Sequence, residues 1–127
     1  MRVLSALLGA TALLLAVPTG SAAPPKVRLA VSSVRVVPDT PRAGQTLTAS
    51  VRVSRRDTGG TVRSGKVACL ATVGRGKLAV VSSGFSAGRA VCRWRLPATA
   101  RRRTLVGSIR VDALQSFVRK YFGRPIV

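Results

Sequence analysis

The 127-residue sequence has no histidine, no glutamate and only three aspartates, Asp39, Asp57 and Asp112. Each aspartate lies in a segment predicted to be a turn, where its carboxylate can bond to the local backbone. Without histidine the chain cannot form a Ser–His–Asp triad or a Cys–His pair, and a catalytic carboxylate pair would need two distant turns to converge. We therefore expect no enzymatic activity and no cofactor. Aromatic residues make up only 4% of the chain, so the core must consist mainly of Val, Leu and Ala.

The sequence also lacks an apolar run as long as a membrane span, which takes about 20 residues. The apolar run Val3–Val17 has 15 residues, follows Arg2 and leads to the small residues Ala22 and Ala23. This order is typical of a cleavable signal peptide. We expect cleavage after Ala22, since a cut one residue later would place Pro24 in a disfavoured position. The protein is then secreted or extracellular, with no transmembrane span in its mature form; an uncleaved anchor is the alternative.

Acidic residues are few beside the 22 lysines and arginines, and the formal net charge is +19. Such an excess favours attraction to anionic polymers such as cell-wall polyanions, acidic glycans, lipid head groups or nucleic acid. Eighteen of the basic residues are arginine, and an Arg- and Ala-rich composition also fits a GC-rich coding sequence. The charge is thus functional, compositional or both.

Only two cysteines are present, Cys69 and Cys92. Each falls on the apolar side of an alternating run, and Trp94 follows Cys92 on the same side, so we expect Trp94 in the core. Two inward cysteines in an exported chain favour a disulfide, worth roughly 3.4 kcal/mol in the chain-entropy model. Two buried free thiols are the alternative. A zinc site is not expected, because two cysteines without histidine cannot complete the metal's ligand shell.

Runs of apolar or alternating residues between turn signals predict an all-β sandwich of about seven strands. In the first run the apolar parity flips between Val31 and Val34, which predicts either a bulge or a strand that changes sheets. The last run has no clear inward side. We expect a Gly/Ser loop at Ser82–Gly88 and a turn at Asp112–Leu114. The predicted strands lie within residues 27–36, 47–53, 65–73, 78–81, 88–96, 105–111 and 115–122.

Short motifs follow one another along the chain: Ala43-Gly44, Leu47–Val51, Ser64–Val67, Gly88–Cys92, Leu96-Pro97 and Leu105–Ile109. Their order resembles bacterial immunoglobulin-like (Big-type) domains of secreted and surface proteins, over about residues 34–121. The resemblance implies a single sandwich in which 65–73 is strand C and 88–96 is strand E. Those strands belong to opposite sheets, so a Cys69–Cys92 bridge would join the sheets.

The same resemblance implies a spacer, adhesion or accessory role. Antibody-style recognition is not implied, because Trp94 follows the second cysteine, whereas in antibody domains the tryptophan lies between the two. The expected organisation is a signal peptide at 1–22, a lead-in with the first strand segment at 23–33, the immunoglobulin-like sandwich at 34–122 and a C-terminal tail at 123–127.

Arginine clusters are the candidate binding residues, because guanidinium forks suit phosphate, sulfate and carboxylate. No exposed aromatic residues are expected between them, so we expect no sequence-specific nucleic-acid partner. We expect a secreted non-enzymatic module that binds cell-envelope or extracellular polyanions partly by charge. The alternative is a small cationic effector or inhibitor that binds one protein target through its turns, and a merely solvated basic face also remains open. The candidates are Arg55, Arg56, Arg89, Arg93, Arg95, Arg101, Arg102 and Arg103.

Overall fold

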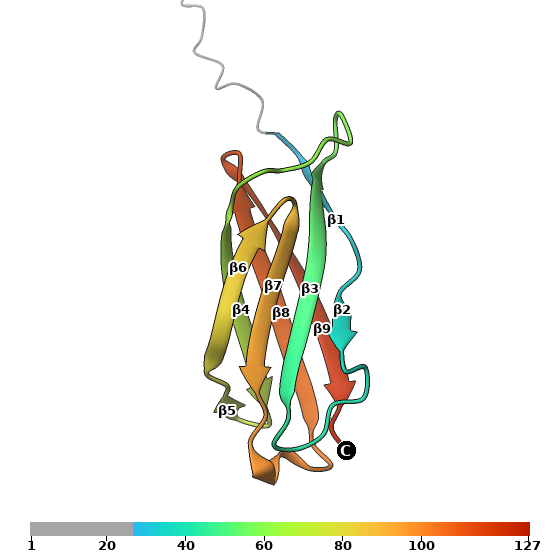
Figure 1. Cartoon of the computed structure of the whole chain (residues 1–127), viewed down its shortest axis with the longest axis vertical. Coiled ribbons are helices and arrows are strands. Elements are labelled where there is room, and N and C mark those ends of the chain that lie inside the picture. The colour runs from blue at the N-terminus through green and yellow to red at the C-terminus, as the bar shows by residue number, and fades with distance from the viewer. Residues whose placement is uncertain (1–26) are drawn as a thin grey trace, which may run out of the picture.

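The computed structural model describes residues 27–127, so the expected signal peptide at 1–22 lies outside the described residues. The described chain is all-β apart from one 3₁₀ turn, η1 (Ala98–Ala100) (Figure 1). The strands are β1 (Leu29–Val31), β2 (Arg35–Val37), β3 (Thr46–Arg55), β4 (Lys66–Val73), β5 (Gly76–Lys77), β6 (Val80–Ser86), β7 (Arg89–Arg95), β8 (Thr104–Ala113) and β9 (Ser116–Pro125).

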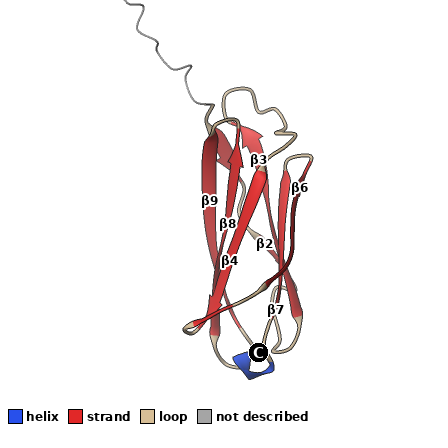
Figure 2. Cartoon of the chain, turned by 90° about the vertical axis from the view of Figure 1, so that its left-hand side faces the viewer, coloured by secondary structure: helices blue, strands red, loops and turns tan. Residues whose placement is uncertain are grey.

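The strands form two antiparallel sheets that pack face to face (Figure 2). One sheet has the order β1-β3-β7-β6, with β2 also paired to β3, and the other has the order β5-β4-β8-β9. When the strands are lettered along the chain, the first sheet has the order A-B-E-D and the second has the order C-F-G, as in an immunoglobulin-like sandwich, with β5 as a short addition beside C. The predicted fold class is therefore confirmed, and the two cysteine-bearing runs are strands C and E as the resemblance implied.

The parity flip in the first run is a bulge. Val31 pairs with Val53 and Arg35 pairs with Ser50, so four steps along the first run match three steps along β3. The extra residue moves the inward set from odd to even positions, and both Leu29 and Val36 are buried. β1 and β2 stay on the same edge of β3, so the chain does not change sheets here.

Three segments differ from the sequence prediction. Residues 82–86, expected as a loop, belong to strand β6, which pairs with β7. The pairing of their backbone with β7 outweighs the low strand propensity of the serines and glycine. Asp112 and Ala113 are the end of β8, so the turn is Leu114-Gln115. Of residues 123–127, expected as a tail, 123–125 complete β9, and Ile126 follows it into the core.

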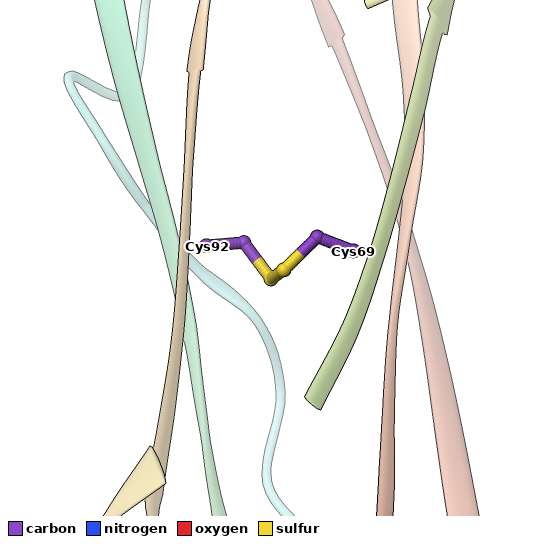
Figure 3. The surroundings of a disulfide bond; sticks show 2 residues. All are labelled: Cys69 and Cys92. Atoms are coloured by element: carbon purple, nitrogen blue, oxygen red, sulfur yellow. A yellow bond between two sulfur atoms is a disulfide. The ribbon is translucent and has the colours of Figure 1, made fainter. Parts of the chain in front are cut away.

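The core lies between the sheets and contains Trp94, whose side chain is fully buried as predicted. Its ring centroid is 5.8 Å from that of Phe122 on β9. Beside it, the predicted Cys69–Cys92 disulfide links β4 to β7 across the sandwich, with the two Cα atoms 5.9 Å apart (Figure 3). The bridge thus joins the two sheets through their facing sides, as expected.

Strand β9 explains why its inward side could not be read from the sequence. The side that turns toward the core holds Val118, Lys120 and Phe122, whereas Phe117 and Tyr121 are exposed on the outer side. β9 is the last strand of its sheet, and a charged residue on the inner side of such an edge strand discourages pairing with another chain. Polar and apolar residues are therefore mixed on both sides of β9.

Candidate polyanion-binding surface

Arginines gather on the outer side of the sheet formed by β2, β3, β7 and β6. Alternation along β7 sends Cys92 and Trp94 inward, so Arg89, Arg93 and Arg95 are exposed on the other side. The register then places β3 and β2 residues beside them, with Arg52 opposite Arg89 and Arg35 opposite Ser50. We call these five residues the arginine face: Arg35, Arg52, Arg89, Arg93 and Arg95.

The arginine face carries no carboxylate among the described residues. Each of the three aspartates is paired with an arginine elsewhere: the Asp57–Arg55 pair is 2.9 Å long, Asp112–Arg110 3.0 Å and Asp39–Arg124 3.2 Å. Arg52 and Arg89 lie directly opposite each other, and like charges in that position repel. The face therefore has uncompensated positive charge that an anionic ligand would neutralise.

Hydroxyl groups lie among these arginines. A shallow cavity of about 520 Å³ between β6 and β7 is lined by Ser82, Ser86, Arg89 and Arg93, among others. The Nη2 group of Arg89 also donates to the Oγ atom of Ser50 across the strands, at 3.4 Å. Hydroxyl and guanidinium donors on one concave surface can bind the oxygens of a sulfate, phosphate or carboxylate group.

The structure does not bring all the sequence-predicted arginines together. Arg101, Arg102 and Arg103 follow η1 at one end of the sandwich (Figure 1), where Arg103 and Arg95 both line a cavity of about 620 Å³. This loop is thus adjacent to one end of the arginine face. The face also includes Arg35 and Arg52, which were not among the sequence-predicted candidates. Alternation along their own strands indicates that both point outward, but no sequence pattern indicates that β2 and β3 share a sheet with β7.

Arg55 and Arg56 lie at the opposite end, where β3 runs into the next turn (Figure 1). Arg55 donates from Nε and Nη2 to the two carboxylate oxygens of Asp57. This hydrogen bonding holds the pKa of Asp57 below its ordinary value and raises the pKa of Arg55. Alternation along β3 gives Arg55 the parity of the buried residues Val51 and Val53, so Arg55 does not share the outer side of the sheet with Arg52.

The exposed aromatic residues of the described chain lie on a different surface from the candidate arginines. Aromatic residues do alternate with arginine outside the core, because Phe117, Arg119 and Tyr121 follow one another on the outer side of β9. This surface belongs to the β4–β8–β9 sheet and not to the arginine face. Within residues 27–127, no group of three metal-binding side chains could hold an ion, and no helix has the length and apolarity to cross a membrane.

No protein-family model matches the sequence, and no curated protein matches it. Among solved structures, a chimeric titin Z1Z2 carrying a decorin peptide is similar with a TM-score of 0.46 and 18% identity, over 77% of this chain and 97% of that one. Domains 4 and 5 of the S-layer protein SbsC are similar with a TM-score of 0.41 and 15% identity, over 79% of this chain and 54% of that one.

Proposed function

We propose that this protein is a secreted, non-enzymatic immunoglobulin-like module that binds polyanionic polymers of the cell envelope or extracellular matrix through the arginine face. The single observation that carries the proposal is the exposed set of five arginines on one sheet without an acidic residue among them. Guanidinium groups suit the oxygen geometry of phosphate, sulfate and carboxylate, and a flat sheet can follow a linear polymer without reading its sequence.

The extracellular location is part of the proposal. The Cys69–Cys92 disulfide supports it, because such bonds form and persist in oxidising compartments. The absence of histidine and glutamate from the whole chain supports the non-enzymatic role. The motif order that resembles bacterial surface domains supports a role at the envelope.

Retention of the purified protein on immobilised heparin, cell-wall polyanion and neutral glycan tests the proposal. At 0.1 M salt the screening length is about 10 Å, and at 1 M it is about 3 Å. We therefore expect retention on both polyanions at low salt, its loss at high salt, and no retention on the neutral glycan. Failure to bind either polyanion at low salt would make the charge compositional.

A matched pair of variants locates the surface. Arg52→Gln/Arg89→Gln/Arg93→Gln removes three charges from the arginine face, and Arg42→Gln/Arg63→Gln/Arg75→Gln removes three from exposed turns. Elution of the first variant at clearly lower salt than the second is the expected result, since only the first loses adjacent contacts with one polymer. Equal elution of the two variants would show that net charge alone controls binding and would reject the face as a site.

A further inference from the structure

The outer side of the β4–β8–β9 sheet carries a cluster of exposed apolar side chains. Leu70, Val106, Phe117 and Tyr121 are 47%, 51%, 56% and 66% exposed, respectively. The register places Leu70 opposite Ser108 and Ser108 opposite Tyr121, so one row crosses all three strands. In the view of Figure 2, these strands form the layer opposite the arginine-bearing sheet, so the outer side of this layer points away from that sheet. Val106 is two residues from Ser108 on β8 and is therefore the diagonal neighbour of both Leu70 and Tyr121, whereas Phe117 lies beyond Arg119 on β9. Large exposed apolar groups gathered on one side of a sheet in this way mark interaction sites.

Two arginines lie within this cluster. Arg110 on β8 is directly opposite Arg119 on β9, so two positive charges occupy neighbouring positions at an energetic cost. Asp112 pairs with Arg110 alone, through its Nε and Nη2 groups. The pair of arginines therefore keeps an excess positive charge between Phe117 and Tyr121, and a carboxylate from outside would relieve it.

Arg110 is held in place before any partner arrives. Its guanidinium carbon lies 4.2 Å from the ring centroid of Phe117, and Asp112 binds the side of the group that carries Nε and Nη2. No hydrogen bond to Nη1 is found among the described residues, so this end is available to an acceptor. A side chain that is already ordered loses less conformational entropy on binding.

The residue types decide between classes of partner. Phe117 and Tyr121 could stack on sugars or bases, but Leu70 and Val106 have no flat ring and require an apolar surface opposite them. Exposed aromatic residues together with arginine are enriched at protein–protein interfaces. A second copy is a poor source of this carboxylate, because the chain has a formal net charge of +19 and only three aspartates, each of which already binds an arginine.

From these observations we infer that the outer side of the β4–β8–β9 sheet is a docking surface for a protein partner whose apolar patch carries a carboxylate that binds between Arg110 and Arg119. This surface is separate from the arginine face, and its occupant is recognised by shape and apolar contact as well as by charge. It also lies on a sheet, whereas the sequence alone favoured turns for binding a protein target.

Chemical-shift mapping with defined probes tests the docking surface. The test probe is a synthetic peptide in which aspartate alternates with leucine and phenylalanine, and the comparison probe alternates aspartate with serine at equal charge. We expect the first peptide to shift the amides of β4, β8 and β9 at a salt concentration that releases heparin, and the second to shift none there. The inference would be overturned if both peptides shifted the amides of β4, β8 and β9 equally, or if the first peptide shifted the amides of the arginine face instead.

Variants and a nucleic-acid probe complete the test. Leu70→Ser/Tyr121→Ser should weaken binding of the apolar acidic peptide at least about fivefold, while Val37→Ser/Val81→Ser, which removes exposed apolar groups from the other sheet, should not. Arg119→Gln should weaken binding, and Arg93→Gln should leave it unchanged. Tighter binding of oligothymidylate than of the peptide at β9 would overturn the inference in favour of a nucleic-acid partner. Heparin retention is scored separately, so either proposal can fail alone.

Discussion

Gly107 on β8 is the position where a single methyl group should most clearly damage the core. Gly107 pairs with Phe122 on β9, and a Cβ atom built on Gly107 would lie 2.5 Å from the ring's Cζ and 2.6 Å from its Cε1. The ring is rigid at these atoms, and its centroid lies 5.8 Å from that of the buried Trp94, which limits how far it can move. Gly107→Ala should therefore destabilise the fold, although alanine normally stabilises a strand relative to glycine.

The expected size follows from two opposing effects. Replacing glycine by alanine inside a strand usually gains roughly 0.5–1 kcal/mol, whereas overpacking a core usually costs about 1–3 kcal/mol. We expect the second effect to dominate, so that the free energy of unfolding falls by roughly 0.5–2 kcal/mol after the gain is subtracted from the cost. For a domain of this size the Tm should fall by roughly 4–8 °C for each kcal/mol.

Thermal and urea unfolding measure this change, and Gly84→Ala provides the control. Gly84 lies in β6, and a Cβ atom there would meet nothing within 4 Å, so the control should be neutral or slightly stabilising. In a Phe122→Leu background, the cost of Gly107→Ala should shrink by at least about 0.5 kcal/mol, because the clashing ring is gone. Stability equal to or above that of the parent for Gly107→Ala would refute the reasoning.

Three further predictions concern the bridge, the chain end and one ion pair. Cys69→Ala/Cys92→Ala should lower the free energy of unfolding by roughly 3.4 kcal/mol, and non-reducing peptide mapping of the parent should recover the two residues linked. Ile126→Ala should cost about 2–5 kcal/mol in urea unfolding, whereas a loose tail would tolerate the change. The carboxyl pKa of Asp57, followed by NMR, should lie below its ordinary value and rise toward it in Arg55→Ala. Because folding lowers the pKa of Asp57, the ion pair stabilises the fold at pH values above the ordinary aspartate pKa. This stabilisation is lost as the pH falls through the folded-state pKa; a group whose pKa is raised on folding would show the opposite dependence.

The arginine residues show how much of the candidate site could be predicted from the sequence. Alternation along residues 89–95 correctly predicted that Arg89, Arg93 and Arg95 would be exposed, since Cys92 and Trp94 share the opposite parity and are buried. The same alternation puts Arg52 on the outer side of β3, between the buried residues Val51 and Val53. The binding surface as a whole was not predictable, because its membership depends on which strands pair.

The periodicity of single strands was enough to predict the fold class and a break in the first run, and the two inward cysteines favoured a disulfide. The structure decided that the break is a bulge and that the bridge forms between the sheets. The features that the sequence predicted are local, since a period of two fixes which side of a strand each residue occupies. Cross-strand register is a property of tertiary pairing. Only the folded sandwich decided that Arg35 and Arg52 join the β7 arginines, that Ile126 enters the core, and that Phe117 and Tyr121 face solvent while Lys120 turns inward. β9 mixes polar and apolar residues on both sides, so its orientation is set by the packing of Phe122 on Gly107 and Trp94 and not by any pattern within its own sequence.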